Sequence, residues 1–320
     1  MAPETTATEF DVRDEAFHAP GPEEQWSDSL YFGGGDARSG LAFYARIGAR
    51  PNEGVIEAAL GVWLPPTRTG LPPRFLLAFA REATPADLPG APVAAGPVTF
   101  TCGVPFEHWR VAVDGEARLW ARAEDLGEHP EAHQQVQVSG ELRFTSWVPP
   151  FHFDSGLTNA VASRHYEQPG SVSGVLVVGD ERFPVHGAGM RDHSWGVRDW
   201  QAVPYWRWMG MLVDPDHFLL VNNVGVRGEH GVTETVGGCL MLGGVLAPVV
   251  SGSTEGTQRD FVARATDARG RTATLRGAAI SVAPLRQRRG ERLTTVNEGL
   301  TRLEWLGHEA FGISEWLEQT

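Results

Sequence analysis

The sequence predicts an antiparallel all-β protein, either a barrel or a sandwich. Short apolar runs alternate with a period of two, and turn residues separate them at short intervals. The 38 glycines and 22 prolines among 320 residues supply chemistry for many turns. No segment shows the helical period over more than about two turns. The length is enough for about two domains of roughly 150 residues each.

Six pairs of apolar runs flank a short turn and are predicted hairpins. In chain order the pairs are 41–48 with 55–63, 109–113 with 116–122, 174–178 with 181–185, 208–213 with 218–224, 261–266 with 272–276, and 302–306 with 311–316. The turn Asp114-Gly115 is a strong signal, because both central positions tolerate positive φ. The segments 64–98 and 148–165 are rich in proline and glycine and interrupt the strands. We expect the second to be a linker.

The predicted organisation is therefore an N-terminal arm and two β-domains. Residues 1–22 form the expected arm, residues 23–164 the N-terminal domain and residues 165–320 the C-terminal domain.

The charge balance argues against nucleic acid and anionic membranes as partners. Arginine supplies all 27 basic residues against 40 acidic ones, so the net charge is −13 and phosphate groups are repelled. The absence of lysine excludes Schiff-base chemistry, a pyridoxal-phosphate anchor and a P-loop lysine. Cys102 and Cys239 lie too far apart in sequence for a thiolate metal motif, and two cysteines make no disulfide scaffold.

The sequence predicts a cytoplasmic protein without a membrane segment. The first residues are acidic where a signal peptide is basic and then apolar, and no apolar stretch reaches about 18 residues. We expect a monomer or a homodimer that needs no cofactor. The histidines show no metal-ligand spacing, and no nicotinamide or flavin fingerprint follows Gly33-Gly34-Gly35.

Candidate site residues concentrate in one stretch. Trp195, Trp200, Trp206 and Trp208 lie within fourteen residues, next to Asp192, His193 and Asp199. An acid and an imidazole among indoles are the parts of a general acid/base site in an apolar pocket. On a strand, Asp192 and Ser194 point to one face and His193 and Trp195 to the other, unless a bulge at Gly189 or Gly196 brings them together. The alternative is structural: indoles stacked on arginines, and a histidine held in the core.

Three motifs make the chain resemble a known superfamily. They are G-x-G-M-R-D-H-S-W-G-x-R over 187–198, Y-E-Q-x-G over 166–170, and F-G-I-S-E over 311–315, with a weaker W-S-D-S-L-Y over 26–31. This combination resembles the carotenoid 1,2-hydratase (hydroxyneurosporene synthase) superfamily. The resemblance implies two lipocalin-like β-domains packed side by side, with His193 and Trp195 facing the pocket between them.

The resemblance implies an enzyme but does not select one reaction. Relatives hydrate isoprenoid double bonds or cyclise polyketides in the manner of Diels–Alderases. The aspartate that donates the proton in the hydratases corresponds to Asn222, and an amide cannot deliver a proton. Asp192, Asp199 or Glu167 must then supply the acid.

The predicted activity is acid/base chemistry on a hydrophobic, unsaturated isoprenoid or polyketide. Asp192 and His193 are the expected acid/base pair, acting as a unit, with Asp199 and Glu167 as further acids. The expected substrate-binding residues are Trp195, Trp200, Tyr166, Trp206, Trp208 and Asn222. The alternatives are a shape-driven pericyclase and a carrier of an apolar ligand. An acid and His193 facing one cavity would favour catalysis, whereas both locked to backbone groups would favour a carrier.

Overall fold

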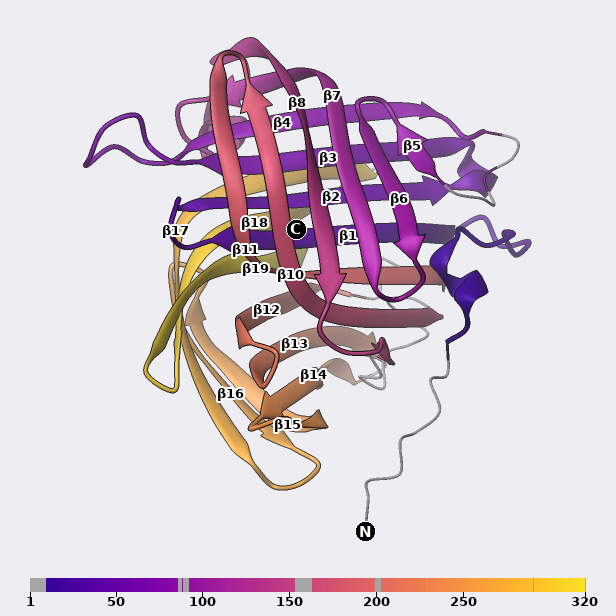
Figure 1. Ribbon diagram of the computed structural model, residues 1–320. Helices are drawn as coiled ribbons and strands as arrows, with labels where there is room; N and C mark the ends of the chain where they lie inside the picture. Colours follow the sequence, from indigo (N-terminus) through magenta and orange to yellow (C-terminus); the bar gives the residue numbers. More distant parts are fainter. Residues whose placement is uncertain are drawn as a thin grey trace.

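The computed structural model describes residues 10–85, 88, 92–152, 163–198, 203–228, 230–289 and 291–319, and these form two antiparallel β-sheets packed against each other (Figure 1). Helical segments within the described residues are short. They are η1 (Val12–Glu15), η2 (Pro51–Glu53) and α1 (Asp125–Glu128). The predicted all-β class is therefore confirmed.

The first sheet is built from the strands of the N-terminal half and the hairpin that follows. Its strands are β1 (Trp26–Asp36), β2 (Leu41–Arg50), β3 (Val55–Leu64), β4 (Arg74–Ala83), β5 (Val93–Ala95), β6 (Val98–Val104), β7 (His108–Trp120), β8 (His133–Ser146), β9 (Phe151–His152), β10 (Arg164–Val178) and β11 (Glu181–Val197). The order is β4-β3-β2-β1-β11-β10-β8-β7-β6-β5, with β9 on β10. Because β4 also pairs with β7, the sheet curls round on itself.

The second sheet is a closed barrel whose strands follow one another in chain order (Figure 1, orange to yellow). They are β12 (Tyr205–Asp214), β13 (His217–Gly228), β14 (Gly231–Leu242), β15 (Val245–Thr257), β16 (Asp260–Asp267), β17 (Thr272–Arg289), β18 (Arg292–Trp305) and β19 (His308–Gln319). Closure leaves no edge strand, because β12 pairs with both β13 and β19.

Alternation along the strands divides the apolar side chains among three cores. In β1, Leu30 and Phe32 point into the core of the first sheet, whereas Tyr31 points toward the barrel. Met209 and Met211 of β12 fill the barrel, and the adjacent Trp208 faces the first sheet. The two sheets therefore share an apolar interface, as expected for two lipocalin-like domains packed side by side.

Five of the six predicted hairpins are confirmed, and the one at Asp114-Gly115 is wrong. β7 continues through these residues because it changes partner there: residues before the bend pair with β6, and residues 118–120 pair with β4. Gly115 allows the bend, since its φ is +155° and a Cβ would lie 2.9 Å from Pro97. The segment 64–98 was expected to interrupt the strands, yet it contains β4 and β5.

The chain passes from the first sheet to the second after β11. The expected boundary at residues 164/165 does not coincide with this change, because the hairpin β10–β11 pairs with β8 and β1 and completes the first sheet. Of the expected linker 148–165, residues 153–162 lie outside the described residues.

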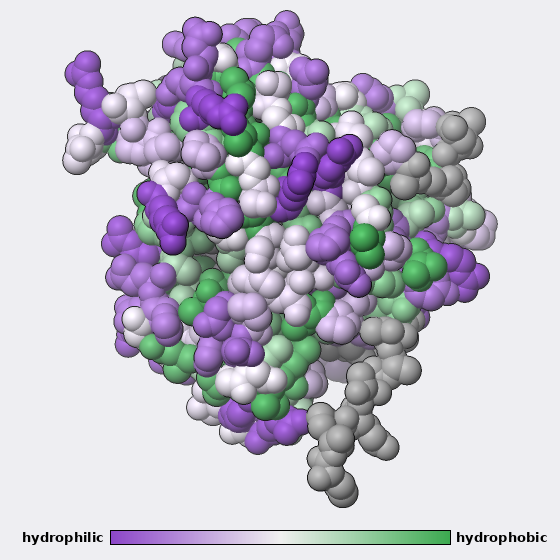
Figure 2. All heavy atoms as spheres, viewed as in Figure 1, coloured by the Kyte–Doolittle hydropathy of each residue, from purple (hydrophilic) through white to green (hydrophobic). Residues whose placement is uncertain are grey.

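The surface carries no large run of apolar side chains in the view of Figure 2, where hydrophobic residues are interspersed with hydrophilic ones. Among the described residues, no helix is long and apolar enough to cross a membrane.

The β1–β11 pairing depends on glycine at position 187. A Cβ there would lie 2.0 Å from the carbonyl oxygen of Gly35 on β1, and backbone cannot move aside as a flexible side chain can. We expect Gly187→Ala to lower the free energy of unfolding by about 2 kcal/mol in urea denaturation. Gly228→Ala is the matched control, because its nearest contact would be 3.7 Å away. Equal effects of the two substitutions would contradict this account.

Candidate active site

A cavity of about 530 Å³ lies between the two sheets. Its walls come from β1, β2, β3, β10 and β11 on one side and from β12, β13, β18 and β19 on the other. The volume falls in the range of small-molecule sites. Because of the period-two alternation, every second residue on these strands faces the cavity.

The first sheet contributes a row of four side chains, which we call the floor row: Arg46, Tyr31, Asp192 and Glu167. Arg46 of β2 pairs with Tyr31 of β1, Tyr31 with Asp192 of β11, and Asp192 with Glu167 of β10. Neighbouring strands are about 4.8 Å apart, so each member of the row lies one strand spacing from the next. All four line the cavity.

The barrel contributes a second row, which we call the roof row: Asn222, Trp208, Glu315 and Glu298. Trp208 of β12 pairs with Asn222 of β13 and with Glu315 of β19, and Glu315 pairs with Glu298 of β18. These four residues also line the cavity. Register in the barrel therefore brings together residues that are up to 107 positions apart in the sequence, from Trp208 to Glu315.

Hydrogen bonds connect the two rows. The indole Nε1 of Trp208 donates to Oε1 of Glu167 at 2.9 Å, and the hydroxyl of Tyr31 donates weakly to Oε2 of Glu298 at 3.4 Å. Within the barrel, Nε1 of Trp206 donates to Oε1 of Glu315 at 2.6 Å. Each indole thus orients a carboxyl group at the cavity wall.

The two rows place four carboxyl groups in a poorly solvated part of the cavity. Burial raises the pKa of Asp192 to about 7; the Arg198 guanidinium opposes this rise and Glu315 adds to it. Burial raises the pKa of Glu167 well above its usual range, and the charge of Asp192 raises it further. Burial and the neighbouring Glu315 likewise raise the pKa of Glu298 well above its usual range. Burial therefore favours the protonated forms of Glu167 and Glu298, and Asp192 is divided between acid and base near pH 7.

Asp192 is the member of this group best placed to meet a ligand. Its side chain is 21% exposed, whereas that of Glu167 is 1% exposed. The Nε2 atom of His165 lies 3.9 Å from both carboxyl groups. Burial lowers the pKa of His165 to about 3, so this imidazole is neutral at physiological pH.

His193, Trp195 and Tyr166 do not line the cavity, which corrects the expectation drawn from the resemblance. β11 is regular here, so His193 and Trp195 point to the opposite face from Asp192 and Ser194. Neither Gly189 nor Gly196 introduces a bulge into the pairing of β11 with β1 or β10. The backbone of the sheet separates Asp192 from His193, so the expected acid/base unit does not form.

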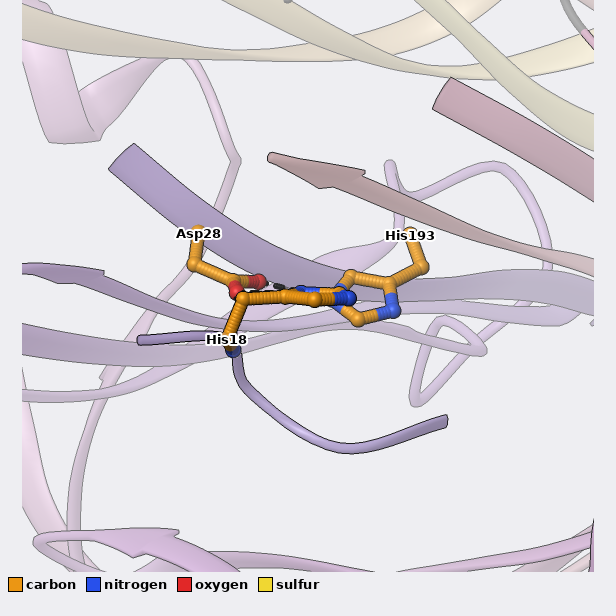
Figure 3. Close-up of side chains that lie close together, drawn as sticks. All are labelled: His18, Asp28 and His193. Carbon is orange, nitrogen blue, oxygen red and sulfur yellow. Dashed lines mark hydrogen bonds and ion pairs between the residues drawn. The ribbon is translucent and has the colours of Figure 1, made fainter. Parts of the chain in front are cut away.

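His193 instead joins a cluster with Asp28 and the N-terminal segment (Figure 3). Its Nδ1 donates to the carbonyl oxygen of Asp14 at 2.7 Å, and its Nε2 is hydrogen-bonded to Oδ1 of Asp28 at 2.7 Å. The other carboxylate oxygen of Asp28 accepts from the backbone N–H of His18 at 2.7 Å and lies 3.0 Å from its Nδ1. The ring of His18 stacks on Trp195 at 4.2 Å.

A buried ion pair attaches the same N-terminal segment to the first sheet. Glu15 accepts hydrogen bonds from Arg191 Nη2 and Phe106 N–H at 2.7 and 2.8 Å, and also from Trp109 Nε1 at 2.8 Å and the Tyr166 hydroxyl. Burial alone would raise the pKa of Glu15, but the Arg191 charge and these hydrogen bonds lower it. Tyr166 therefore serves this attachment and not the cavity.

His18, Asp28 and His193 form the one group of metal-ligand type found among the described residues, with ligand atoms within 4.8 Å of one another. Each oxygen of Asp28 already contacts a different ring, and the second nitrogen of each ring is within hydrogen-bond distance of Asp14. The carboxylate therefore bridges two imidazoles. We interpret the group as a hydrogen-bonded clamp, called here the His–Asp–His clamp.

The structure brings together Asp192, Glu167, Trp206, Trp208 and Asn222 of the predicted site. Asp199 and Trp200 lie outside the described residues. Among the cavity residues that sequence reasoning missed are four members of the two rows: Tyr31, Arg46, Glu298 and Glu315. Tyr31 and Glu315 belong to the motifs over 26–31 and 311–315, so a signal existed for them. Arg46 and Glu298 have no such local signal, because only cross-strand register places them.

Fold and site together define a protein of two packed β-layers with an acid-lined cavity between them. A protein of Nitrosomonas europaea named as an AttH candidate has a similar fold, with a TM-score of 0.60, 13% identity, and 98% of this chain and 97% of that chain covered. CghA is similar at a TM-score of 0.54 and 11% identity, covering 95% and 93% of the two chains. Kievitone hydratase from Nectria haematococca gives 0.54 and 9%, covering 91% and 88%.

These neighbours confirm the fold that the resemblance to the hydratase superfamily implied. No curated protein matches the sequence. The family described as a domain of unknown function, DUF7064, matches residues 11–320, and the chain belongs to this family.

The His–Asp–His clamp predicts a structural role for His193. We expect His193→Gln to lower the free energy of unfolding by about 3 kcal/mol, because it removes one partner of a buried pair. Urea denaturation measures the change, and His186→Gln, at an exposed position of the same strand, is the control. Unchanged stability together with a specific loss of turnover would instead assign His193 to the chemistry.

The clamp also predicts a pH dependence of stability. Burial would lower the pKa of His18, but its hydrogen bonds with Asp28 and Asp14 outweigh burial and raise it. A raised folded pKa gives stability that is complete below the unfolded value of about 6.5 and is lost as pH rises through the folded value. We expect the melting temperature to fall as pH rises above about 6.5, with a component that His18→Gln lacks. An identical pH profile for wild type and His18→Gln would show that the contact contributes no stability.

Proposed function

We propose that this protein is a cofactor-independent acid/base enzyme that protonates a carbon–carbon double bond of a hydrophobic substrate held between the two sheets. The observation that carries this proposal is Asp192, a partly exposed carboxyl at the cavity wall whose pKa is raised by burial to about 7. A general acid is most useful when its pKa lies near the operating pH.

The proposed step is balanced within the cavity. The carboxyl proton of Asp192 transfers to one alkene carbon, which leaves a carboxylate on the protein and a carbocation on the substrate. The rings of Trp206, Trp208 and Tyr31 line the space, and aromatic faces stabilise positive charge. The carboxylate that proton transfer leaves on Asp192 favours the cation electrostatically.

Three outcomes follow from the cation, depending on what reaches it. Addition of water, with return of its proton to Asp192, hydrates the substrate. Loss of a neighbouring proton to Asp192 isomerises it. Attack by a second double bond closes a ring and moves the positive charge to a new carbon, which then loses a proton to Asp192. Similarity of fold to a protein named kievitone hydratase supports hydration as the first reaction to test. We propose an isoprenoid or a polyketide as the substrate.

The orientation of Asp192 fits an enzyme, whereas the orientation of His193 fits a carrier. Asp192 faces the cavity, as an enzyme requires, whereas His193 is bound to the backbone carbonyl of Asp14 and to Asp28. The proposal therefore uses a carboxyl acid without a histidine partner. Glu167, Glu298 and Glu315 line the same cavity as further buried carboxyl groups.

Incubation of the purified protein with metabolite extract of its host, followed by mass spectrometry, tests the proposal. Hydration adds the mass of one water to one compound, and isomerisation or cyclisation changes retention at constant mass. A compound that is bound but returned unchanged would support a carrier and overturn the proposal.

The central variant is Asp192→Asn, which keeps size and removes the titrating proton. With a substrate identified in this way, we expect the turnover of the variant to fall by roughly two to four orders of magnitude. In wild type, kcat/KM should decline as pH rises through about 7, because the acid form is required, and the residual rate of the variant should lack this decline.

Asp180→Asn at the exposed turn between β10 and β11 is the matched control and should leave both quantities unchanged. Near-wild-type turnover of Asp192→Asn would remove Asp192 from the mechanism.

A further inference from the structure

Arg46 sits at one end of the floor row with its guanidinium enclosed in the cavity. Glycine at position 48 makes room for this group, because a Cβ there would lie 2.4 Å from Nη2 of Arg46. The planar guanidinium therefore lies along the strand against bare backbone. One strand, β1, separates Arg46 from Asp192.

The guanidinium of Arg46 has no protein partner. Within the described residues, no hydrogen bond reaches it and no carboxylate forms an ion pair with it. Glu57, whose charge acts on Arg46, is already used by Arg50 at 2.9 Å and by Arg81 at 3.1 Å. Arg191 on the opposite face of the sheet, by contrast, is fully paired with Glu15.

The Arg46 side chain is half-buried and lines the cavity. A guanidinium that pairs with no described carboxylate keeps its five N–H donors available to a ligand. Burial lowers the pKa of Arg46 from its usual value, and the guanidinium remains charged at any physiological pH. Carboxylates and similar oxyanions fit a guanidinium through two parallel hydrogen bonds.

We propose that Arg46 binds an anionic oxygen of the substrate, a carboxylate or an enolate, and so selects unsaturated hydrophobic acids over neutral hydrocarbons. Two strand spacings place this anchor roughly 10 Å from Asp192, which sets the distance between the acid group and the reacting double bond. The inference rests on the proposed function only for the double-bond end of the substrate. Anion binding at Arg46 can be measured without turnover.

Anion binding at Arg46 would also favour the protonated form of Asp192, the proposed general acid. The positive charge of Arg46 lowers the pKa of Asp192, so neutralising that charge with a substrate oxyanion favours the protonated form of Asp192. Anion binding at Arg46 and protonation of Asp192 are then coupled.

Binding of matched acid and alcohol probes tests the proposal. We would titrate retinoic acid against retinol and farnesoic acid against farnesol at pH 8, following quenching of tryptophan fluorescence. We expect wild type to bind at least one acid about tenfold more tightly than its alcohol, and Arg46→Met to abolish the difference. Arg286→Met is the control for general charge, because Arg286 lines the same cavity but already donates to the carbonyl oxygen of Gly127 at 3.1 Å.

The melting temperatures of two variants distinguish an anion-binding role of Arg46 from a structural one. Arg46→Met should keep or raise the melting temperature of the free protein, since no protein partner loses a contact. Arg191→Met, which leaves Glu15 buried without its cation, should lower it strongly. A fall for Arg46→Met comparable with that for Arg191→Met would overturn the proposal.

The probe titrations have clear contrary outcomes. Equal affinity for acid and alcohol, a preference that survives Arg46→Met, or binding of neither acid would overturn the inference. Asp192→Asn should retain the preference for acids. Loss of turnover in Asp192→Asn without any preference for acids would leave the proposed function standing and remove the role of Arg46 alone.

Discussion

The pairing of β1 with β11 is the constraint on which the rest of the structure depends. It joins the hairpin β10–β11 to the N-terminal strands, and its unbroken register fixes the face of every residue from 187 to 197. Close approach of backbone at Gly187 and Gly189 permits this register. One consequence is that the chemistry-bearing motif is divided: Asp192 points to the cavity, and Arg191 and His193 point away from it.

The two faces of β11 handle buried charge in opposite ways. On the face toward the N-terminal segment, Arg191 is balanced by Glu15, and Asp28 lies between His18 and His193. Burial alone would raise the pKa of Asp28, but the charge of His193 and the hydrogen bonds from His18 lower it. Such compensated groups attach one chain segment to another and contribute to stability when complete.

On the cavity face, the carboxyl groups are not compensated. Glu167 and Glu298 are buried with pKa values well above their usual range, and Asp192 stands near neutrality. Arg46 is a cation on this face that pairs with no carboxylate among the described residues. Perturbed groups of both signs around one cavity are typical of sites that act on a ligand, because stability alone would favour apolar or paired side chains there.

The sequence by itself determined the fold class, five hairpins and half of the site. Period-two patterns and turn residues are local features, so they can be interpreted without knowledge of the partner strand. The predicted hairpin at Asp114-Gly115 was wrong because β7 changes partner there. Asp192 was predicted from the density of its motif, and Glu167 from the resemblance, which places Asn222 where the hydratases have an acid. Only the tertiary structure decided that His193 faces away, since a regular strand and a bulged one have the same sequence signal. It also decided that Arg46, Glu298 and Glu315 join the cavity, because cross-strand register and sheet packing bring distant residues together and leave no local trace in the chain.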